Sequence, residues 1–471
     1  MYRLVLYFLI ILVGYSILLG LVGAIPGLGL NLLFSSLFLV GVGWLTNQTF
    51  AKIYAAPTNV ESVYISALIL ALIITPPHAL SGLPFLAGAA ALTMASKFIL
   101  AIGKKHIFNP VAIAVWLTSV TMGQFASWWI GHPAMLPLVV LGGLLVIRKT
   151  RRFGMVCSFL TSAIVVILLT KSDLQLSLLY SPLVFFASVM LTEPQTTPPT
   201  NNLRLMYGIL VGLLFIPRVH WGSVYLTPEL ALVLSNVFSY LVSPKQKLTM
   251  VLKDKIQVAA GVWDYVFTAD QKLSFQPGQY LEWTLGHPHP DARGNRRYFS
   301  ITSSPSEADS SFGIKFYPSG SSFKTYLANM SPGEKIMASQ LAGDLTLPSD
   351  INRKCVFIAG GIGITPFRSM IKYLLDIHQL RPIILLYSNK TAAEVAYTDI
   401  FTRARQELGI KTVYKIGRIN EAMIKSEVPD YQDRLFYLSG PHSLVSAFEV
   451  LLNQMGVSRS RIKIDFFPGY T

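Results

Sequence analysis

The chain has 471 residues, 52% of them hydrophobic, and these numbers exclude both a single ordinary domain and a wholly water-soluble protein. Its formal net charge is +15, but the sequence has no arginine-rich helix, aromatic RNA-binding motif or zinc-finger spacing, so we expect no nucleic-acid partner. The two cysteines, Cys157 and Cys355, exclude a disulfide framework, a zinc site and cysteine ligation of an iron–sulfur cluster, and we expect no metal site.

Residues 1–242 consist of a succession of apolar runs, and a transmembrane helix needs about 20 apolar residues. We predict about ten spans, centred near residues 12, 37, 69, 92, 114, 140, 162, 183, 210 and 235. The first run follows Arg3 as in a signal peptide, but it continues to about residue 24 and further runs follow, so we expect a retained helix. The sequence therefore predicts a polytopic helical membrane domain over residues 1–242.

The lysines and arginines between these runs indicate the orientation of the chain. If the N-terminus faces inward, the inner segments contain Arg3, Lys52, Lys104, Lys105, Arg148, Lys149, Arg151, Arg152, Arg204, Lys245 and Lys247. The outer segments contain only Lys171 and Arg218. We therefore expect an integral protein of a bacterial inner membrane, with both termini and the C-terminal half in the cytoplasm.

Two segments of the membrane half are polar and contain proline, namely residues 96–110 and residues 191–200. Segments of this kind line binding cavities inside membrane proteins. They also occur as interfacial loops whose lysines extend toward water. Composition alone leaves both interpretations open.

The strings GKKHIFNPVA at 103–112, TEPQTTPPT at 192–200 and RLMYGILVG at 204–212 resemble the NqrB/RnfD family. Members of that family are membrane subunits of ion-translocating NADH:quinone and NAD:ferredoxin oxidoreductases. The resemblance covers most of residues 60–240.

In that family the helices hold flavins, and one FMN is esterified to a threonine in a Ser-Gly-Ala-Thr type motif. No such motif occurs in this chain, so the resemblance implies neither a covalent flavin nor ion translocation here. It does imply a site for an additional non-covalent flavin or a quinone near His106, Asn109 and Glu193.

Short alternating runs broken by turns extend from Leu248 to about Pro348, at 262–268, 280–285, 298–302 and 313–317. This spacing predicts an antiparallel β-barrel domain over residues 243–349. The barrel contains the string RRYFSITSSP at 296–305. An arginine can offer a fork of donors to a pyrophosphate, an aromatic ring can cover a flavin, and a nearby hydroxyl can reach a ring nitrogen. An edge strand with a solvated arginine pair is the other interpretation.

The string KCVFIAGGIGITPFRSM at 354–370 predicts a strand ending at Ala359, a glycine turn and a helix. Glycine allows the backbone to bend sharply and approach a ligand, and Pro366 suits the first helical turn. The N–H groups of that helix would face an anion such as a dinucleotide pyrophosphate. A lone glycine fingerprint is also compatible with an ordinary turn, so it is weak evidence by itself. We expect an α/β, Rossmann-like domain over residues 350–471.

Several further strings occur in a fixed order around these two. They are FQPGQY at 275–280, YPSGSSF at 317–323, PGEKI at 332–336, LAGDLTL at 341–347 and FYLSGP at 436–441. Taken together, the ordered motifs resemble the ferredoxin–NADP reductase superfamily across residues 248–471. The resemblance implies an FAD-binding barrel of the ferredoxin-reductase (FR) type followed by an NAD(P)-binding domain.

The resemblance also implies roles for individual residues of the barrel. Arg297 would bind the FAD pyrophosphate, Phe299 would stack at the flavin, and Ser300 would lie near its reactive N5. Phenylalanine stands where many members have tyrosine, so a phenolic hydrogen bond is lost. The loop for the second phosphate is assigned to Gly320, Ser321 and Ser322.

In the nucleotide domain, the resemblance assigns the pyridine-nucleotide turn to Gly360, Gly361, Gly363, Thr365 and Pro366. Gly440 and Pro441 match the motif beside the nicotinamide, and Ser439 replaces a cysteine found near the hydride in many members. Ser300 and Ser439 are therefore the candidate catalytic residues. Tyr470 would either cover the flavin until nicotinamide displaces it or only pack. Lys390 alone does not decide between NAD and NADP.

These features predict a membrane-bound flavoprotein oxidoreductase whose partners are the lipid bilayer, NADH or NADPH, and a membrane or soluble electron acceptor. Electrons would pass from cytoplasmic NAD(P)H through FAD to a quinone, a flavin or a partner redox protein. One alternative is a haem-containing reductase of the ferric reductase or NADPH oxidase type. The histidines of the membrane half, His78, His106, His132 and His220, lack the repeated spacing that such haems need. Another alternative is a membrane carrier with a regulatory flavin redox-sensor domain.

Overall fold

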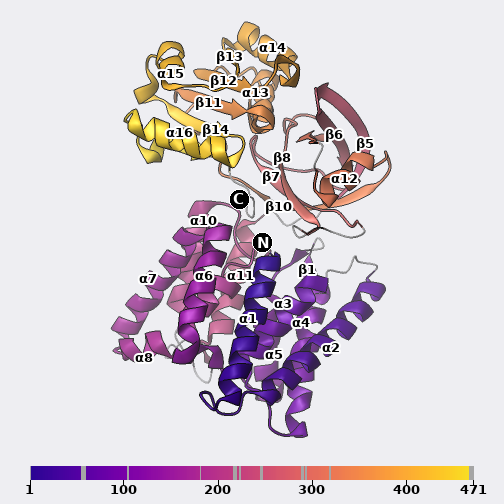
Figure 1. Cartoon of the computed structure of the whole chain (residues 1–471), viewed down its shortest axis with the longest axis vertical. Coiled ribbons are helices and arrows are strands. Elements are labelled where there is room, and N and C mark those ends of the chain that lie inside the picture. The colour runs from indigo at the N-terminus through magenta and orange to yellow at the C-terminus, as the bar shows by residue number, and fades with distance from the viewer. Residues whose placement is uncertain are drawn as a thin grey trace. The chain divides into compact units, whose positions relative to one another are not determined.

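The computed structural model describes residues 2–54, 60–102, 105–180, 182–215, 220–221, 224–243, 248–287, 291, 294–317 and 320–465. The chain divides into two compact units, Met1–Gln246 and Lys247–Thr471. The first unit is helical, and the second combines an antiparallel sheet with a parallel sheet and its helices (Figure 1).

The helices of the first unit run side by side (Figure 1). They are α1 (Tyr2–Leu21), α2 (Leu30–Ile53), α3 (Val60–Ile73), α4 (Leu83–Ile99), α5 (Pro110–Met122), α6 (Leu136–Thr150), α7 (Phe153–Leu169), α8 (Leu174–Leu179), α9 (Leu183–Phe185), the π-helix η4 (Phe186–Met190), α10 (Asn201–Leu214) and α11 (Pro228–Val242). Short 3-10 turns lie at Leu80–Gly82, Trp129–Gly131 and Pro133–Met135, and two hairpins complete the unit. The first hairpin pairs β1 (Ala101–Ile102) with β2 (Lys105–His106), and the second pairs β3 (His220–Trp221) with β4 (Val224–Tyr225).

Helix is present at every predicted span centre, which confirms a helical N-terminal region with several apolar helices. Among the described residues, four segments are long and apolar enough to cross a membrane, namely Tyr2–Leu21, Leu30–Ile53, Leu80–Ile99 and Pro133–Thr150. Other apolar helices, such as Glu61–Ile73, are shorter. The run centred near residue 183 is divided between α8, α9 and η4. The predicted count of ten spans is therefore not confirmed.

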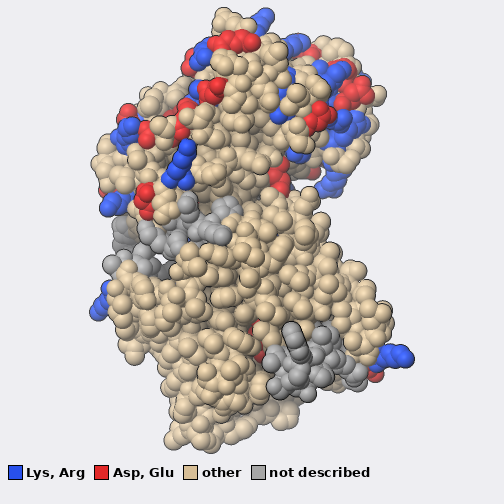
Figure 2. Space-filling model, turned by 180° about the vertical axis from the view of Figure 1, so that it is seen from behind, with Lys and Arg blue, Asp and Glu red and all other residues tan. Residues whose placement is uncertain are grey.

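Large apolar side chains cover the outside of this unit, as expected for a surface that faces lipid. Leu18 is 61% exposed, Leu37 is 65% exposed and Leu141 is 65% exposed. On the face seen in Figure 2, lysine, arginine and carboxylate side chains gather over the second unit, whereas the helical unit has few of them. The helical unit thus has the surface of an integral membrane protein.

Helices α7 and α10 pack closely because glycine lies at their contact. A Cβ atom at Gly208 would lie 2.4 Å from the Met155 carbonyl oxygen, and one at Gly212 would lie 2.5 Å from the Phe159 carbonyl oxygen. The Ser158 hydroxyl donates across the contact to the Leu205 carbonyl oxygen at 3.1 Å. Small residues of this kind let two membrane helices approach at backbone distance.

The second unit begins with a six-stranded antiparallel sheet in the order β8-β7-β10-β5-β6-β9. Its strands are β5 (Leu248–Ala259), β6 (Val262–Ala269), β7 (Tyr280–Thr284), β8 (Arg296–Ser300), β9 (Ser310–Lys315) and β10 (Lys335–Ala342), and helix α12 (Ser322–Asn329) accompanies them. Just beyond β8, the Thr302 N–H donates to the Ser311 carbonyl oxygen on β9 at 2.8 Å, which links the two outer strands. The predicted strands overlap β6 to β9, and the closed barrel stays a prediction.

A five-stranded parallel sheet follows, in the order β13-β12-β11-β14-β15. Its elements are β11 (Cys355–Gly360), α13 (Thr365–Asp376), β12 (Ile383–Asn389), α14 (Thr398–Leu408), β13 (Lys411–Ile416), α15 (Glu421–Glu427), β14 (Leu435–Ser439), α16 (His442–Gln454) and β15 (Ile462–Ile464). Helices α13 and α14 cover one face of this sheet, and α15 and α16 cover the other (Figure 1). The strand order reverses between β11 and β14, so the carboxyl ends of these strands open a crevice where ligands bind in such folds.

Candidate active site

The glycine turn lies at this crevice, directly after β11. Residues Gly361–Ile364 form a 3-10 turn, and α13 begins at Thr365 with Pro366 in its first turn, as predicted. A Cβ atom at Gly363 would lie 2.3 Å from the Ser439 carbonyl oxygen and 2.5 Å from the Gly440 nitrogen. Only glycine fits there, and the turn is held against the end of β14.

The segment after β14 completes this side of the crevice. Ser439 pairs with Ala359 in the parallel register. Gly440 has φ 157°, and Pro441 precedes α16 as its N-cap. The structure thus brings together the two glycine motifs that the sequence places about 80 residues apart.

Ser300 and Ser439 meet through a third residue that the sequence did not indicate. The Ser439 hydroxyl donates to Asp465 Oδ2 at 3.0 Å, and the Ser300 hydroxyl donates to the same oxygen at 3.4 Å. Asp465 follows β15 directly, and burial raises the pKa of its carboxyl to about 7, although both hydroxyl groups partly offset this effect. The two candidate catalytic hydroxyls therefore share one acceptor that titrates near neutral pH.

Arg297 lies on β8 with 4% of its surface exposed. Its Nη1 donates to the carbonyl oxygens of Gly294 at 3.1 Å and Arg296 at 2.7 Å, and its Nη2 lies 3.5 Å from Asp291 Oδ1. The guanidinium centre lies 5.1 Å from the centre of the Phe323 ring. These contacts hold a buried cation in one orientation.

The Asp291 carboxylate also receives the Ser322 backbone N–H at 3.2 Å, at the start of α12. The Ser322 hydroxyl in turn receives the Asp291 N–H at 2.9 Å and lies 3.0 Å from His287 Nε2. The neighbouring Ser321 caps α12 by accepting the Lys324 N–H. An internal carboxylate thus occupies a donor set built from a guanidinium and a helix N-terminus, which is the set that suits a phosphate.

Strand alternation places Arg297 and Phe299 on one face of β8 and Ser300 on the other. The Phe299 ring centre lies 4.5 Å from that of Trp283 and 6.1 Å from that of Phe323. Phe299 is only partly buried, so one part of its surface remains available to a ligand.

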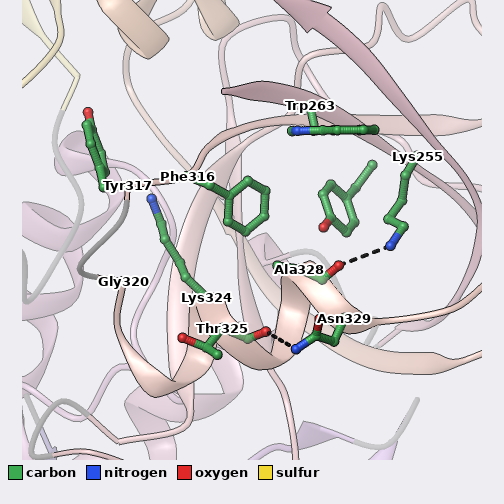
Figure 3. Close-up of a pocket in the computed structure, with 10 residues that line it drawn as sticks. Lys255, Trp263, Phe316, Tyr317, Gly320, Lys324, Thr325, Ala328 and Asn329 are labelled. Carbon is green, nitrogen blue, oxygen red and sulfur yellow. Dashed lines mark hydrogen bonds between the residues drawn. The ribbon is translucent and has the colours of Figure 1, made fainter. Parts of the chain in front are cut away.

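A pocket of about 450 Å³ lies beside Gly320, between the sheet and α12 (Figure 3). Aromatic side chains, notably Trp263 and Tyr317, form its walls. Lys324 Nζ lies 5.5 Å from the centre of the Tyr317 ring, and Lys255 Nζ donates to the Ala328 carbonyl oxygen at 3.1 Å (Figure 3). Such a pocket suits a flat ring system linked to a phosphate.

The two polar segments of the helical unit also meet. Glu193 accepts hydrogen bonds from Asn109 Nδ2 at 2.9 Å and from the Thr196 hydroxyl at 3.0 Å, and His106 Nε2 lies 3.6 Å from its other oxygen. A cavity of about 70 Å³ adjoins this cluster, and Glu193 and Asn109 are in its wall with Ser62.

The other described histidine side chains of this unit have local polar partners. His78 Nδ1 lies 3.0 Å from Asn31 Nδ2, and His132 Nδ1 accepts the Ala134 N–H at 3.2 Å. Within the described ranges, no group of three or more His, Cys, Asp or Glu side chains could hold a metal ion.

The predicted site residues thus fall into three groups in the structure. The glycine turn adjoins Gly440, Ser300 shares Asp465 with Ser439, and Arg297 is linked to Ser322 through Asp291. Tyr470 lies outside the described residues. The ligand roles assigned to all these residues stay predictions.

Two family matches follow the same division of the chain. Residues 118–247 match the NQR2, RnfD, RnfE family. Residues 357–449 match the oxidoreductase NAD-binding domain. Both agree with the families inferred from the motifs, and they confirm that inference for these segments.

Curated relatives match part of the chain. An NADPH oxidoreductase of Mycobacterium tuberculosis is 27% identical over 204 residues, which are 41% of this chain and 53% of that protein. The glycine betaine monooxygenase reductase subunit of Pseudomonas aeruginosa is 27% identical over 235 residues, or 45% of this chain and 63% of that protein. The chain therefore spans between half and two thirds of these relatives.

Solved structures similar to the chain include the Amycolatopsis cytochrome P450 reductase GcoB, with 22% identity, a TM-score of 0.42 and coverage of 47% of this chain and 70% of that one. Another is the flavohem-like FAD/NAD binding domain of a Vibrio cholerae nitric oxide dioxygenase, with 22% identity, a TM-score of 0.41 and coverage of 47% and 98%. By its two family matches, this chain joins a segment of the NQR2, RnfD, RnfE membrane family to an oxidoreductase NAD-binding domain.

Proposed function

We propose that the chain is a membrane-bound reductase that takes a hydride from NADH or NADPH onto FAD and passes the electrons to an acceptor in or at the membrane. The single observation that carries this proposal is the meeting of Ser300, Ser439 and Asp465 at the crevice of the parallel sheet. It brings the strand with the flavin motif and the strand with the nicotinamide motif to one point. FAD, when bound, supplies the step from hydride to single-electron chemistry.

The donor set around Arg297 fits FAD. The guanidinium and the Ser322 N–H already hold the Asp291 carboxylate, which stands in for a phosphate oxygen, so a pyrophosphate would find both donors in place. The aromatic pocket beside Gly320 suits the adenosine end of the cofactor.

On the nucleotide side, the turn that contains Gly363 would bind the pyrophosphate of NADH or NADPH at the start of α13. Asp465 holds the hydroxyls of Ser300 and Ser439 and so orients both toward the crevice. Because its pKa is about 7, this carboxyl can hold or release a proton under physiological conditions. The proposed work of these residues is to orient the two rings, exclude water and hold a proton at Asp465.

The acceptor site is proposed to lie in the helical unit at the cluster of His106, Asn109 and Glu193. Polar and ionisable side chains buried in a membrane unit commonly mark the path of a substrate or ion. A quinone or a non-covalent flavin would meet a carboxylate, an amide and an imidazole there. We further propose that the protein is integral to a bacterial inner membrane, with both termini and the C-terminal unit in the cytoplasm.

The test of the FAD site is the pair of variants Arg297→Lys and Arg296→Lys in the full-length protein in detergent. The two arginines are neighbours on opposite faces of β8, and Arg296 pairs with Glu282 at 3.3 Å. Lysine keeps the charge but lacks the two-pronged fork, so R297K is expected to lose most of its acid-extractable FAD and R296K to retain it. Wild-type protein without FAD, or unable to oxidise either NADH or NADPH with ferricyanide, would refute the proposed function.

A further inference from the structure

Four side chains, three of them buried and one partly exposed, connect the antiparallel sheet to the nucleotide domain, and the function proposed above does not use them. They are Asp264, Glu307, Arg368 and Tyr397, and the first two belong to the sheet and its loops. Arg368 lies on α13, three residues after the start of that helix at the glycine turn. A contact at this place bears directly on where the turn lies relative to β8.

Arg368 is 9% exposed and makes three contacts with the segment that follows β8. Its Nη1 donates to the Thr302 carbonyl oxygen at 3.1 Å and also binds Glu307 Oε2, and its Nη2 donates to Glu307 Oε1 at 3.1 Å. The next residue, Ser369, donates to the Ser303 carbonyl oxygen at 2.6 Å. Helix α13 is therefore bound to backbone only two and three residues beyond Ser300.

Tyr397 forms a second connection. Its hydroxyl donates to Asp264 Oδ1 at 2.6 Å, and the Arg368 guanidinium lies 5.8 Å from the centre of its ring. The residue has φ 61°, in the left-handed backbone region that residues other than glycine rarely adopt, and it is 6% exposed. Such a conformation persists where the surrounding contacts determine it.

Between the two connections, the residue that follows the glycine turn, Thr365, contacts the backbone of the antiparallel sheet directly. A Cβ atom at Gly313 on β9 would lie 2.6 Å from Thr365 Cγ2 and 2.6 Å from the Tyr397 hydroxyl. The Gly313 N–H donates to the Thr302 hydroxyl at 2.7 Å. Thr365 is thus seated on β9, and no side chain separates the turn from the strand.

The charges of the cluster fix its geometry more strictly than apolar packing would. Arg368 is flanked by the carboxylates of Glu307 and Asp264, and burial raises the pKa of Asp264. A buried charge that loses its partner is costly, so the domains cannot slide without breaking several of these contacts at once. Glu307 is itself held by the Ser304 N–H.

We propose that Arg368 and Tyr397 are positioning residues, which hold the glycine turn at one fixed distance from β8. This inference rests on the proposed function, in which one hydride moves from the dihydronicotinamide to the oxidised flavin and no other reactant is consumed. The two residues exchange no proton or electron. Their contribution is geometric, and a displacement of about 1 Å lowers the rate of such a transfer by roughly 100-fold.

The test uses Arg368→Met and Tyr397→Phe in the full-length protein, with Arg403→Met as the control. Arg403 lies on α14 and pairs at 3.0 Å with Glu407 of the same helix, so its loss disturbs no contact between domains. The first measurement is hydrogen–deuterium exchange, which requires no activity. R368M is expected to exchange faster at residues 302–313 and 362–370, and R403M to exchange as the wild type does.

The second measurement is flavin reduction by rapid mixing with NADH or NADPH. For R368M we expect unchanged FAD content, a KM within about threefold and a reduction rate roughly 10- to 100-fold lower. Y397F, which removes one hydroxyl and leaves Arg368 in place, is expected to show a smaller loss of the same kind.

Unchanged exchange in R368M and Y397F, or a loss of rate that only follows a loss of FAD, would overturn the positioning role. A wild-type protein that holds no FAD would instead overturn the proposed function. The two failures are therefore distinguishable.

Discussion

Asp465 joins strands from two domains, because it accepts the hydroxyl of Ser300 on β8 and that of Ser439 on β14. A carboxyl in this place lacks a cationic partner among the groups that shift its pKa. Burial therefore outweighs the two hydrogen bonds and raises the pKa from 3.8 to about 7. Near neutral pH this one residue changes the charge of the crevice.

A raised pKa makes a definite prediction for stability. Between about pH 4 and pH 7 the folded chain keeps the Asp465 proton that the unfolded chain loses, so the contribution of Asp465 is greatest below pH 4 and is lost as pH rises to 7. Asp465→Asn removes this dependence. The difference in Tm between D465N and wild type, followed by the release of FAD fluorescence, should therefore shift in favour of D465N from pH 5.5 to pH 8. The exposed Asp433→Asn serves as control, and a difference that does not change with pH would contradict the assignment.

At the scale of single residues, the sequence predicted members of the candidate site where they belong to a short contiguous motif. Arg297, Ser300 and Gly363 belong to such strings. Asp465 does not, and Arg368 lies inside such a string without a predicted role, because the importance of both comes from the residues that the fold brings beside them. Asp465 follows β15, a strand that was not predicted from the sequence, so no local signal pointed to it.

The helical elements depend on close contacts that hydropathy does not reveal. The apolar runs predicted where helices occur, but prolines and the π-helix η4 divide the run near residue 183 into short pieces. Runs of apolar residues therefore predicted the existence of helices well and their lengths poorly. The packing of α7 on α10 follows instead from the placement of glycine.

Gly212→Ala tests that packing. The added methyl would lie 2.5 Å from the Phe159 carbonyl oxygen and 2.0 Å from the Ser162 hydroxyl, so the helices must move apart. We expect a destabilisation of about 1–3 kcal/mol, seen as a lower Tm in detergent. Gly41→Ala in α2 has nothing within 4 Å of the added atom and should leave Tm unchanged or raise it. Equal effects of the two variants would show that the contact between α7 and α10 does not limit stability.

The whole molecule combines two chemistries that can be measured separately. Reduction of a bound flavin by NAD(P)H is proposed for the C-terminal unit, and transfer to a membrane acceptor is proposed for the helical unit. A small water-soluble oxidant such as ferricyanide would report on the first reaction. A quinone presented in detergent or lipid would report on both.

Glu193→Gln should therefore separate the two reactions. The amide keeps the shape of the side chain but removes the carboxylate. That carboxylate lies 3.6 Å from His106 Nε2 and accepts hydrogen bonds from Asn109 and Thr196. Because nothing in the C-terminal unit changes, we expect the rate with NAD(P)H and ferricyanide to stay within about twofold of wild type and quinone reduction to fall by roughly 10-fold or more. Glu61→Gln, which affects the pair with Arg3 in the same unit, is the matched control and should leave both rates unchanged. A parallel fall of both rates in E193Q would place the acceptor elsewhere, because a defect confined to the membrane cluster cannot slow the reduction of ferricyanide.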